Sequence, residues 1–343
     1  MFKTITQKID WDQALEEVDA FDFYHTYDYH FTASKKDEKP ILLYYNDSHS
    51  IIALPLVIRA IPDTNYFDAT SVYGYGGPLS KNVTSNSNLT DFHTQLRRFF
   101  KEKKIITVFS SLNPYIPNQK KIISGLGKIE SQGKVVNINI TQNNEAQELQ
   151  FSKTTKRYIK RNQHLFYARV GNTESDALLF MELYYKTMTR LHAHENYYFP
   201  EAYFKNILKS DSFKAQIIFA ITKDSHQIVS AALMVKTNHN IIQYHLSGTL
   251  EAYKNLSPMR FLINEIRLQG TAEGYTHFNL GGGFGSKQDS LFNFKASFSK
   301  DRKKFKTWKY ILNHQKYNSL SKENKHITAT TTTTFFPLYR YKK

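Results

Sequence analysis

One tripeptide, Asp-Ser-His, occurs at two places in this 343-residue chain, and each copy lies in the turn of a predicted hairpin. Residues 41–59 have the pattern of strand, polar turn and strand, and residues 215–236 repeat it. Each hairpin leads to a Tyr-containing segment, then a helix, then a buried strand. The predicted helices and strands are 91–103 with 105–110 in the first copy and 258–273 with 276–280 in the second. This repeated order indicates an internal duplication, and it constrains the fold more than any single motif does.

The duplication predicts an α/β (α+β) protein of two similar modules, with mixed, mostly antiparallel sheets flanked by helices. We place the modules at residues 1–150 and 151–315, sharing a cleft, because the polar segment 141–150 separates them. A chain of this length fits two domains. Residues 316–343 form a low-complexity tail with a Thr run at 330–334. This tail is either an extended arm that packs back through its aromatic residues or partly disordered.

Charge and composition restrict the classes of partner and of chemistry. Lys and Arg number 46 against 30 Asp and Glu, a net charge of +16. This favours an anionic partner (nucleic acid, a phosphorylated substrate or an anionic lipid surface), and the alternative is an excess of solvated lysine. The chain has no cysteine, which excludes disulfides, thiolate catalysis and zinc sites built on Cys. It has no run of about 18 apolar residues and no signal-peptide pattern, so we expect a soluble, cytoplasmic protein without a transmembrane segment.

A glycine-rich loop at residues 281–285 follows a predicted strand and precedes a predicted helix. Backbone amides in such a loop can hold an anion, and the alternative is a tight turn that only reverses the chain. The loop, which includes Gly282, matches neither a Walker motif nor a dinucleotide fingerprint. Lys295 lies shortly after it, in the apolar and aromatic segment 292–298. Because a lysine is seldom buried unless it is paired, we expect Lys295 to point along the cleft toward an anionic group.

A basic segment without any acid covers residues 152–169. Helical spacing places most of its cations near one face, where they could hold phosphates. The alternative is a solvated basic face. Its cations are Lys153, Lys156, Arg157, Lys160, Arg161 and Arg169. A second basic cluster at residues 300–309 favours one extended basic surface.

A third candidate is the loop Tyr73-Gly-Tyr75-Gly-Gly-Pro78, which is either a packed turn or a binding loop. Other chemistries lack their residues: the histidines are scattered, no Gly-x-Ser-x-Gly elbow occurs, and no paired carboxylates stand out. We therefore expect no metal site. The remaining chemistry is transfer of an already activated acyl group to an amine, in which positioning and oxyanion stabilisation supply most of the rate.

The residues that follow the second hairpin resemble the second module of the Fem-type aminoacyltransferases and their FemAB-like relatives. The resemblance implies a fold of two tandem GNAT-like domains and covers most of residues 1–310. The motifs that carry it are Ser257-Pro258 opening a helix, Gly274 to Gly283, Leu291-x-x-Phe294-Lys295-x-x-Phe298, the basic stretch 156–161 and the turn Tyr73 to Pro78. Ser257 is expected to cap the helix and Pro258 to occupy its first turn.

The resemblance implies transfer of an amino acid from aminoacyl-tRNA to a peptidoglycan precursor, or acylation of another cell-envelope amine. Lys295 matches the family lysine that contacts the acceptor's phosphates, and it is our catalytic candidate. The other expected substrate-binding residues are Arg157 and Arg161 on phosphate, Tyr73, Tyr75 and Tyr253 around the pocket, and Gly282 and Phe294. We expect no tightly bound cofactor, and a co-substrate that is aminoacyl-tRNA or acyl-CoA.

Two alternatives remain open at this point. The turn before Pro258 lacks the paired glycines with which ordinary GNAT enzymes grip the pyrophosphate of acetyl-CoA, and this weakens the acyl-CoA donor. An acyl-CoA-dependent N-acyltransferase acting on an amino sugar of a surface polysaccharide nevertheless stays an alternative. So does a non-catalytic nucleic-acid-binding protein. The expected partners are an anionic, phosphorylated or lipid-linked acceptor, with tRNA and a peripheral membrane surface as further candidates.

Overall fold

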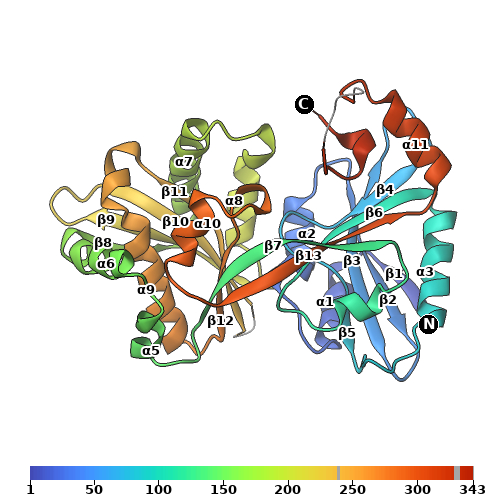
Figure 1. The fold of residues 1–343 in the computed structure, drawn as a ribbon, viewed down its shortest axis with the longest axis horizontal. Helices are drawn as coiled ribbons and strands as arrows, with labels where there is room; N and C mark the ends of the chain where they lie inside the picture. The colour runs from blue at the N-terminus through green and yellow to red at the C-terminus, as the bar shows by residue number, and fades with distance from the viewer. Residues whose placement is uncertain (238–239, 328–332, 343) are drawn as a thin grey trace. The chain divides into compact units, whose positions relative to one another are not determined.

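The computed structural model describes residues 1–237, 240–327 and 333–342, so the first three residues of the predicted Thr run lie outside it. The chain forms two compact units (Figure 1). One comprises Met1–Gln132 with Phe305–Lys343, and the other is Gly133–Lys304. The bounds of these compact units differ from those of the predicted duplicated modules. The module boundaries at residues 150 and 315 stay a prediction.

The first unit is a six-strand ladder with helices on both faces. The strand order is β1-β2-β3-β4-β6-β13, β5 pairs with β3, and the pairing is antiparallel except between β4 and β6. On β2, Leu43 belongs to the core that contains Phe92 of α3, and Leu42 to the core that contains Trp11 of α1. Adjacent residues of the strand thus face opposite sides of the sheet, one covered by α3 and the other by α1. The elements are β1 (Phe2–Ile5), α1 (Lys8–Glu16), η1 (Phe23–His25), α2 (Tyr27–Ala33), β2 (Lys39–Asn46), β3 (Ile51–Ala60), β4 (Phe67–Thr70), β5 (Leu79–Lys81), α3 (Thr90–Glu102), β6 (Ile105–Leu112), α4 (Gln119–Ile122), β13 (Arg302–Ile311), α11 (His314–Glu323) and η5 (Leu338–Arg340).

The second unit repeats the arrangement, with strand order β7-β12-β11-β10-β9-β8 and one parallel pair, β11 with β12. Phe261 and Ile266 of α9 and Ile159 of α6 fill the core on one face of the sheet. On the other face, α7 packs against β11 and α8 against β9. The elements are β7 (Lys128–Asn139), α5 (Asn144–Leu149), α6 (Lys153–Leu165), β8 (Phe166–Gly171), α7 (Glu174–Arg190), η2 (Glu195–Tyr197), α8 (Glu201–Leu208), β9 (Lys214–Thr222), β10 (Ile228–Thr237), β11 (Ile241–Thr249), η3 (Glu251–Leu256), α9 (Pro258–Ala272), β12 (His277–Gly281), η4 (Phe284–Ser286) and α10 (Ser290–Ala296).

The structure confirms the predicted fold class and both hairpins, which are β2–β3 and β9–β10. The predicted helices and the strands that follow them are α3 with β6 and α9 with β12. One local expectation is wrong. Ser257 precedes the helix that begins at Pro258, but its side chain makes no capping hydrogen bond, since its backbone is left-handed with φ 51° and ψ 54°. Pro258 alone supplies the start signal in the first turn.

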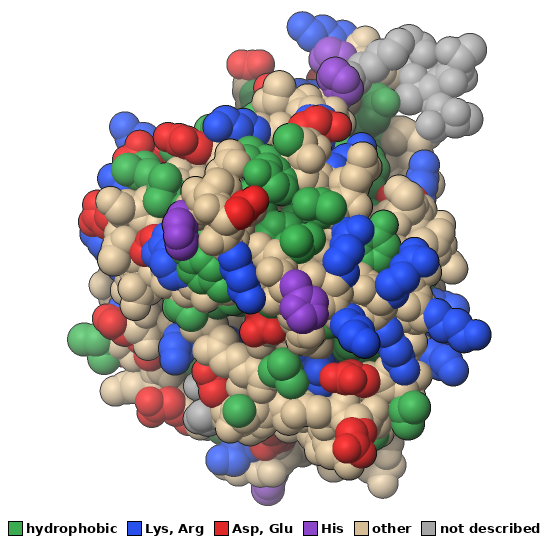
Figure 2. Space-filling view, turned by 90° about the vertical axis from the view of Figure 1, so that its left-hand side faces the viewer, with side chains coloured by type: hydrophobic (Ala, Val, Ile, Leu, Met, Phe, Trp, Pro, Cys, Tyr) green, Lys and Arg blue, Asp and Glu red, His purple; other side chains and the backbone are tan. Residues whose placement is uncertain are grey.

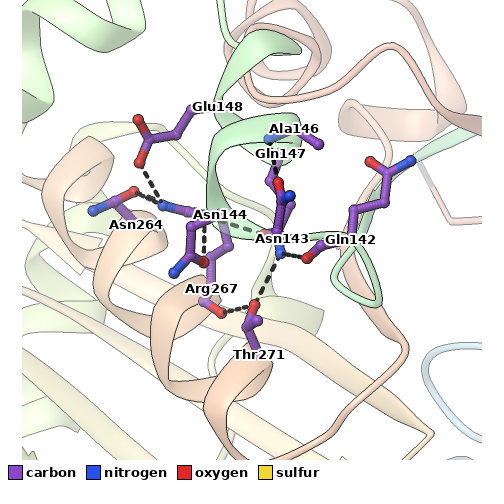
Figure 3. A network of polar contacts seen from close by, with 9 residues as sticks. All are labelled: Gln142, Asn143, Asn144, Ala146, Gln147, Glu148, Asn264, Arg267 and Thr271. Carbon is purple, nitrogen blue, oxygen red and sulfur yellow. Dashed lines mark hydrogen bonds and ion pairs between the residues drawn. The ribbon is translucent and has the colours of Figure 1, made fainter.

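A buried arginine connects α5 to α9 in the second unit (Figure 3). Arg267 is fully buried, and its guanidinium donates to Asn144 at 3.1 Å, Gln147 at 3.2 Å, Glu148 at 3.0 Å and Asn264 at 2.9 Å. A buried guanidinium needs such acceptors, since an unsatisfied buried charge is costly. The network therefore fixes the segment that follows β7 against the central helix.

The C-terminal tail packs onto the first unit through polar and aromatic side chains. The carboxylate of Asp68 is fully buried and accepts from Arg59 at 2.8 Å, from the Tyr339 hydroxyl at 3.1 Å and from Arg340. Phe336 packs against Phe109 with ring centroids 6.3 Å apart. Over these described residues, the tail follows the alternative of an arm that packs back through its aromatic residues.

Candidate active site

Two parallel strands of the second unit diverge at their carboxyl ends. The pairing of β11 with β12 covers Ile241 to Gln243 against His277 to Asn279. Beyond it, β11 carries a bulge at His245, which lies between the two registers of its pairing with β10. A bulge bends a strand and increases its twist. Ligands of open α/β sheets bind outside the carboxyl ends of such strands, so this divergence is where we look for a site.

Lys295 lies at this divergence. Its side chain extends from α10, its ammonium donates to the carbonyl of Gly282 at 2.7 Å, and it lies 5.7 Å from the centroid of the Tyr244 ring on β11. The residue is 8% exposed. Burial lowers the pKa of Lys295 to about 8, although the carboxylate of Asp289 opposes that shift. An ammonium has three donors, and one is used here among the described residues, so its charge is available to an anionic ligand.

The glycine loop beside Lys295 is a tight turn that also leaves amides available. Gly281 has φ +76°, and its amide donates to the Asn279 side chain at 2.9 Å. A Cβ at Gly283 would lie 2.1 Å from the carbonyl of Lys287, so no side chain fits there. No described group accepts a hydrogen bond from the amides of Gly282 or Gly283. The sequence offered two interpretations of this loop, an anion-binding loop and a tight turn, and this geometry is compatible with both.

Asp289 connects the glycine loop to α10. One carboxylate oxygen caps the helix by accepting from the amide of Phe292 at 2.8 Å, and the other accepts from Phe284 at 3.0 Å. Burial raises the pKa of Asp289, but these amides outweigh it and hold the pKa below its usual value. Asp289 thus links the start of the helix that carries Lys295 to the loop that carries its acceptor, Gly282.

Arg260 is a functional candidate that the sequence did not single out. It extends from the first turn of α9 and donates to the hydroxyls of Thr155 and, at 2.7 Å, Ser297. Its guanidinium lies 4.8 Å from the centroid of Phe294 and 5.6 Å from that of Tyr158. Its Nε is buried without a hydrogen-bond partner among the described residues, and burial lowers its pKa.

The expected substrate-binding residues of the second unit occupy neighbouring positions around these groups. Phe294 lies under Arg260, and Arg161 stacks on Tyr158 at 4.6 Å and donates to the carbonyl of Leu256 at 3.0 Å. Arg157 is exposed on α6, 5.8 Å from the same tyrosine ring. Tyr253 uses its hydroxyl on Gln227 of the β9–β10 turn, at 2.9 Å. The structure thus connects Phe294, Arg157 and Arg161 through Arg260 and Tyr158, while Tyr253 is held by the hairpin turn.

The tyrosines of the first unit belong to a closely packed loop. The backbone of Tyr73 accepts from the Tyr29 hydroxyl at 2.8 Å, and the Tyr73 side chain is 45% exposed. Gly74 has φ +118°, and a Cβ there would lie 2.0 Å from the ring of Tyr24. Tyr75 packs edge-on against Tyr24, with centroids 5.7 Å apart, and burial raises the pKa of its hydroxyl. Tyr75 therefore packs within the unit, and Tyr73 is the one of the two that presents its ring to solvent.

Exposed Lys and Arg side chains gather on one side of the face that Figure 2 shows. Figure 2 views the molecule from the side on which α6, β8 and β9 are labelled in Figure 1.

Among the described residues no group of three His, Asp or Glu is placed to hold a metal ion, and no helix is long and apolar enough to span a membrane. An ammonium beside free amides is suited to anionic oxygen, whether of a phosphate or of a developing oxyanion.

Comparison with known proteins assigns the fold. Residues 150–292 match the family model described as an Acetyltransferase (GNAT) domain. The crystal structure of FemX is similar with a TM-score of 0.71 and 11% identity, over 92% of this chain and 99% of that chain. The structure of L-PGS from Bacillus licheniformis is similar with a TM-score of 0.55 and 12% identity, over 90% of this chain and 93% of that chain. A tandem GNAT protein from the clavulanic acid biosynthesis pathway is similar with a TM-score of 0.52 and 6% identity, over 91% of this chain and 99% of that chain. No curated protein matches the sequence.

These similarities confirm the expected tandem GNAT fold of the Fem type. Together with the family match they support an acyltransferase, and they favour an enzyme over the non-catalytic nucleic-acid-binding alternative. The assignment of individual site residues, of a co-substrate and of a cytoplasmic location stays a prediction.

Proposed function

From the GNAT domain and the Fem-type fold of this chain, we propose that it transfers an aminoacyl or acyl group from an activated donor to an amine of an anionic cell-envelope precursor. The peptidoglycan-bridge type of reaction, with aminoacyl-tRNA as donor, is the version that we favour. The observation that carries the proposal is Lys295, a buried ammonium at the divergence of β11 and β12 next to two free amides. The net charge of +16 suits both an anionic acceptor and a polyanionic donor.

The proposed step is an acyl substitution. The acceptor's neutral amine attacks the donor's carbonyl carbon, a C–N bond forms, and the carbonyl oxygen takes negative charge. The bond to the leaving oxygen of the tRNA ribose, or to the sulfur of CoA, then breaks, and the amine loses one proton to the leaving group or to water. Lys295 would stabilise the anionic oxygen or the acceptor's phosphate without being consumed. Arg157 and Arg161 would contribute charge toward phosphate.

A substitution at Lys295 tests this role. We expect Lys295→Met to fold normally and to lose on the order of 100-fold or more in acyl transfer, the range for removing one oxyanion-stabilising group. The matched control is Lys287→Met, an exposed lysine nearby on the same chain segment. Transfer is measured with radiolabelled donor. Unchanged turnover in a folded Lys295→Met variant would remove the assignment.

The same assay, run as a function of pH, shows in which protonation state Lys295 supports acyl transfer. Because burial lowers the pKa of Lys295 to about 8, a role as a cation predicts that kcat/KM decreases about tenfold per pH unit above pH 8. We expect Lys295→Arg, which stays charged, to lack this decrease. Titration of the acceptor amine affects both proteins alike, so activity that rises through pH 8 in the wild type but not in Lys295→Arg would instead assign Lys295 as a base.

The second candidate function is an acyl-CoA-dependent N-acyltransferase acting on an amino sugar, and the acetyltransferase description of the matching family model favours it. Labelled acetyl-CoA and labelled aminoacyl-tRNA, each offered with a phosphorylated muropeptide precursor and with an amino sugar, distinguish the two. Product with acetyl-CoA alone would replace our favoured donor.

A further inference from the structure

Helix α6 exposes cations that the fold of the second unit does not use. Lys153, Lys156 and Lys160 are exposed, and none of their ammonium groups makes an ion pair or hydrogen bond with a described residue. The helix contains no Asp or Glu. Charged side chains on a surface helix are usually interspersed with the opposite charge, so an all-basic exposed face is unusual.

The helix that carries these lysines is firmly anchored. Its Ile159 is buried in the core shared with α9, and the Asn162 side chain donates to the carbonyls of Leu256 at 2.9 Å and Ser257 at 3.1 Å. The N-cap is Ser152, which accepts from the amide of Thr155. The lysines therefore extend from a helix whose backbone is held against α9.

Exposed aliphatic side chains occur at both ends of this helix. Leu149, four residues before it, is 73% exposed, and Leu165, its last residue, is 38% exposed. Val170 on the edge strand β8 is 52% exposed. It lies on the same side of that strand as Phe166, whose ring is 6.3 Å from that of Phe261 on α9. Since α6 also packs against α9, the lysines and Val170 occupy the same side of the sheet.

We propose that this surface, which we call the α6 face (Lys153, Lys156, Lys160, Leu149, Leu165 and Val170), docks on an anionic lipid bilayer. Lysines without partners are attracted to the phosphates of anionic lipids, and exposed aliphatic side chains gain by entering the headgroup region. A nucleic-acid interface would share the lysines, but it gains from aromatic stacking rather than from exposed leucine and valine. The proposal does not depend on the acyl-transfer chemistry, because it uses none of the residues assigned to it.

The test is cosedimentation of the full chain with vesicles. Phosphatidylcholine vesicles with added phosphatidylglycerol are compared with phosphatidylcholine alone at about 0.1 M salt. We expect binding to the anionic vesicles, and a decrease on the order of 10- to 100-fold for the variant Lys153→Gln/Lys156→Gln/Lys160→Gln. The matched control, Lys35→Gln/Lys36→Gln/Lys39→Gln, removes the same charge from exposed lysines of the first unit and should bind as the wild type does.

A second variant separates lipid insertion from charge alone. Leu149→Ser/Val170→Ser keeps every cation, and we expect it to bind the same vesicles several-fold more weakly. Single-stranded poly(A) RNA is the competing ligand. Equal loss with both lysine triples, full binding by the Ser variant, or RNA binding that needs the α6 lysines while vesicles are ignored would each overturn the proposal. Acyl transfer to a soluble acceptor should be unaffected by the α6 triple, so failure here is distinct from failure of the proposed function.

Discussion

At the scale of single residues, Lys295 combines a cost in stability with a position suited to chemistry. An ammonium that is 8% exposed has lost most of its hydration, and one hydrogen bond to Gly282 and one aromatic ring do not replace it in full. The lowered pKa expresses this cost. Residues kept at such a cost are frequent at functional sites, where stability is given up for activity.

Replacing Lys295 by Met should therefore stabilise the protein while it removes the ammonium. We expect Lys295→Met to raise the free energy of unfolding by about 1 to 2 kcal/mol at pH 7, which is less than the full effect of the pKa shift because the hydrogen bond is also lost. Between pH 8 and 10.5 the unfolded chain binds more protons at this lysine than the folded one. Wild-type stability thus rises with pH in that window, and the difference between the proteins should shrink.

Urea unfolding followed by far-UV circular dichroism at pH 7 and pH 10 measures this difference. Comparing the two proteins at each pH cancels the other titrating groups. A Met variant that is less stable at pH 7, or a difference independent of pH, would contradict the account of a desolvated ammonium.

The sequence singles out Lys295 but not Arg260, and the reason is physical. A lysine among Phe292, Phe294 and Phe298 is conspicuous on its own, because such neighbours predict burial. Arg260 lies in an ordinary helix start, and its role depends on Thr155 and Ser297, which are 105 and 37 residues away along the chain. No local pattern indicates that partnership.

At the scale of elements, the second unit depends on how α5 is held against α9. Local pattern predicts α9, since Pro258 and an apolar helical face mark it, but it gives no indication that Arg267 is fully buried and that its guanidinium finds acceptors there. Its acceptors Asn144, Gln147 and Glu148 come from α5, about 120 residues earlier. Periodicity predicts a helix, and only the fold shows what its buried cation contacts (Figure 3).

Removing that cation should cost more than the loss of its one partly exposed ion pair, with Glu148, suggests. We expect Arg267→Met to lower the free energy of unfolding by about 2 to 4 kcal/mol, because the buried side-chain oxygens of Gln147 and Asn264 lose their donors. The control is Glu148→Gln, whose side chain is 52% exposed and whose loss should cost less than about 1 kcal/mol. Both are measured by urea unfolding. Equal effects from the two variants would mean that the ion pair with Glu148, and not the buried amides, carries the network.

At the scale of the whole molecule, the chain exchanges its last strands between the two units. Strand β7, which follows the elements of the first unit, pairs with β12 at His277↔Asn139 and Phe278↔Ile138. Strand β13, which follows those of the second, pairs with β6 at Trp308↔Ser110 and Tyr310↔Val108. The duplicated order of elements was visible in the sequence because each hairpin is local. The exchange of strands was not visible in the sequence, because the alternating pattern of a strand does not indicate which distant strand it pairs with.

The exchange predicts which part of the chain folds by itself. Residues 133–304 contain β8 to β12 and the part of β7 from residue 133 onward, whereas residues 151–315, the predicted module, lack Val136, Ile138 and Ile140, all of which are buried in its core. Burying such a side chain contributes about 1.5 to 3 kcal/mol, so losing three removes on the order of 5 kcal/mol, comparable to the whole stability of a domain. Expressed alone, 133–304 should show cooperative urea unfolding by circular dichroism, and 151–315 should be unfolded or insoluble. If 151–315 instead folds as stably as 133–304, then β7 is dispensable, and the duplicated module rather than the compact unit is what folds.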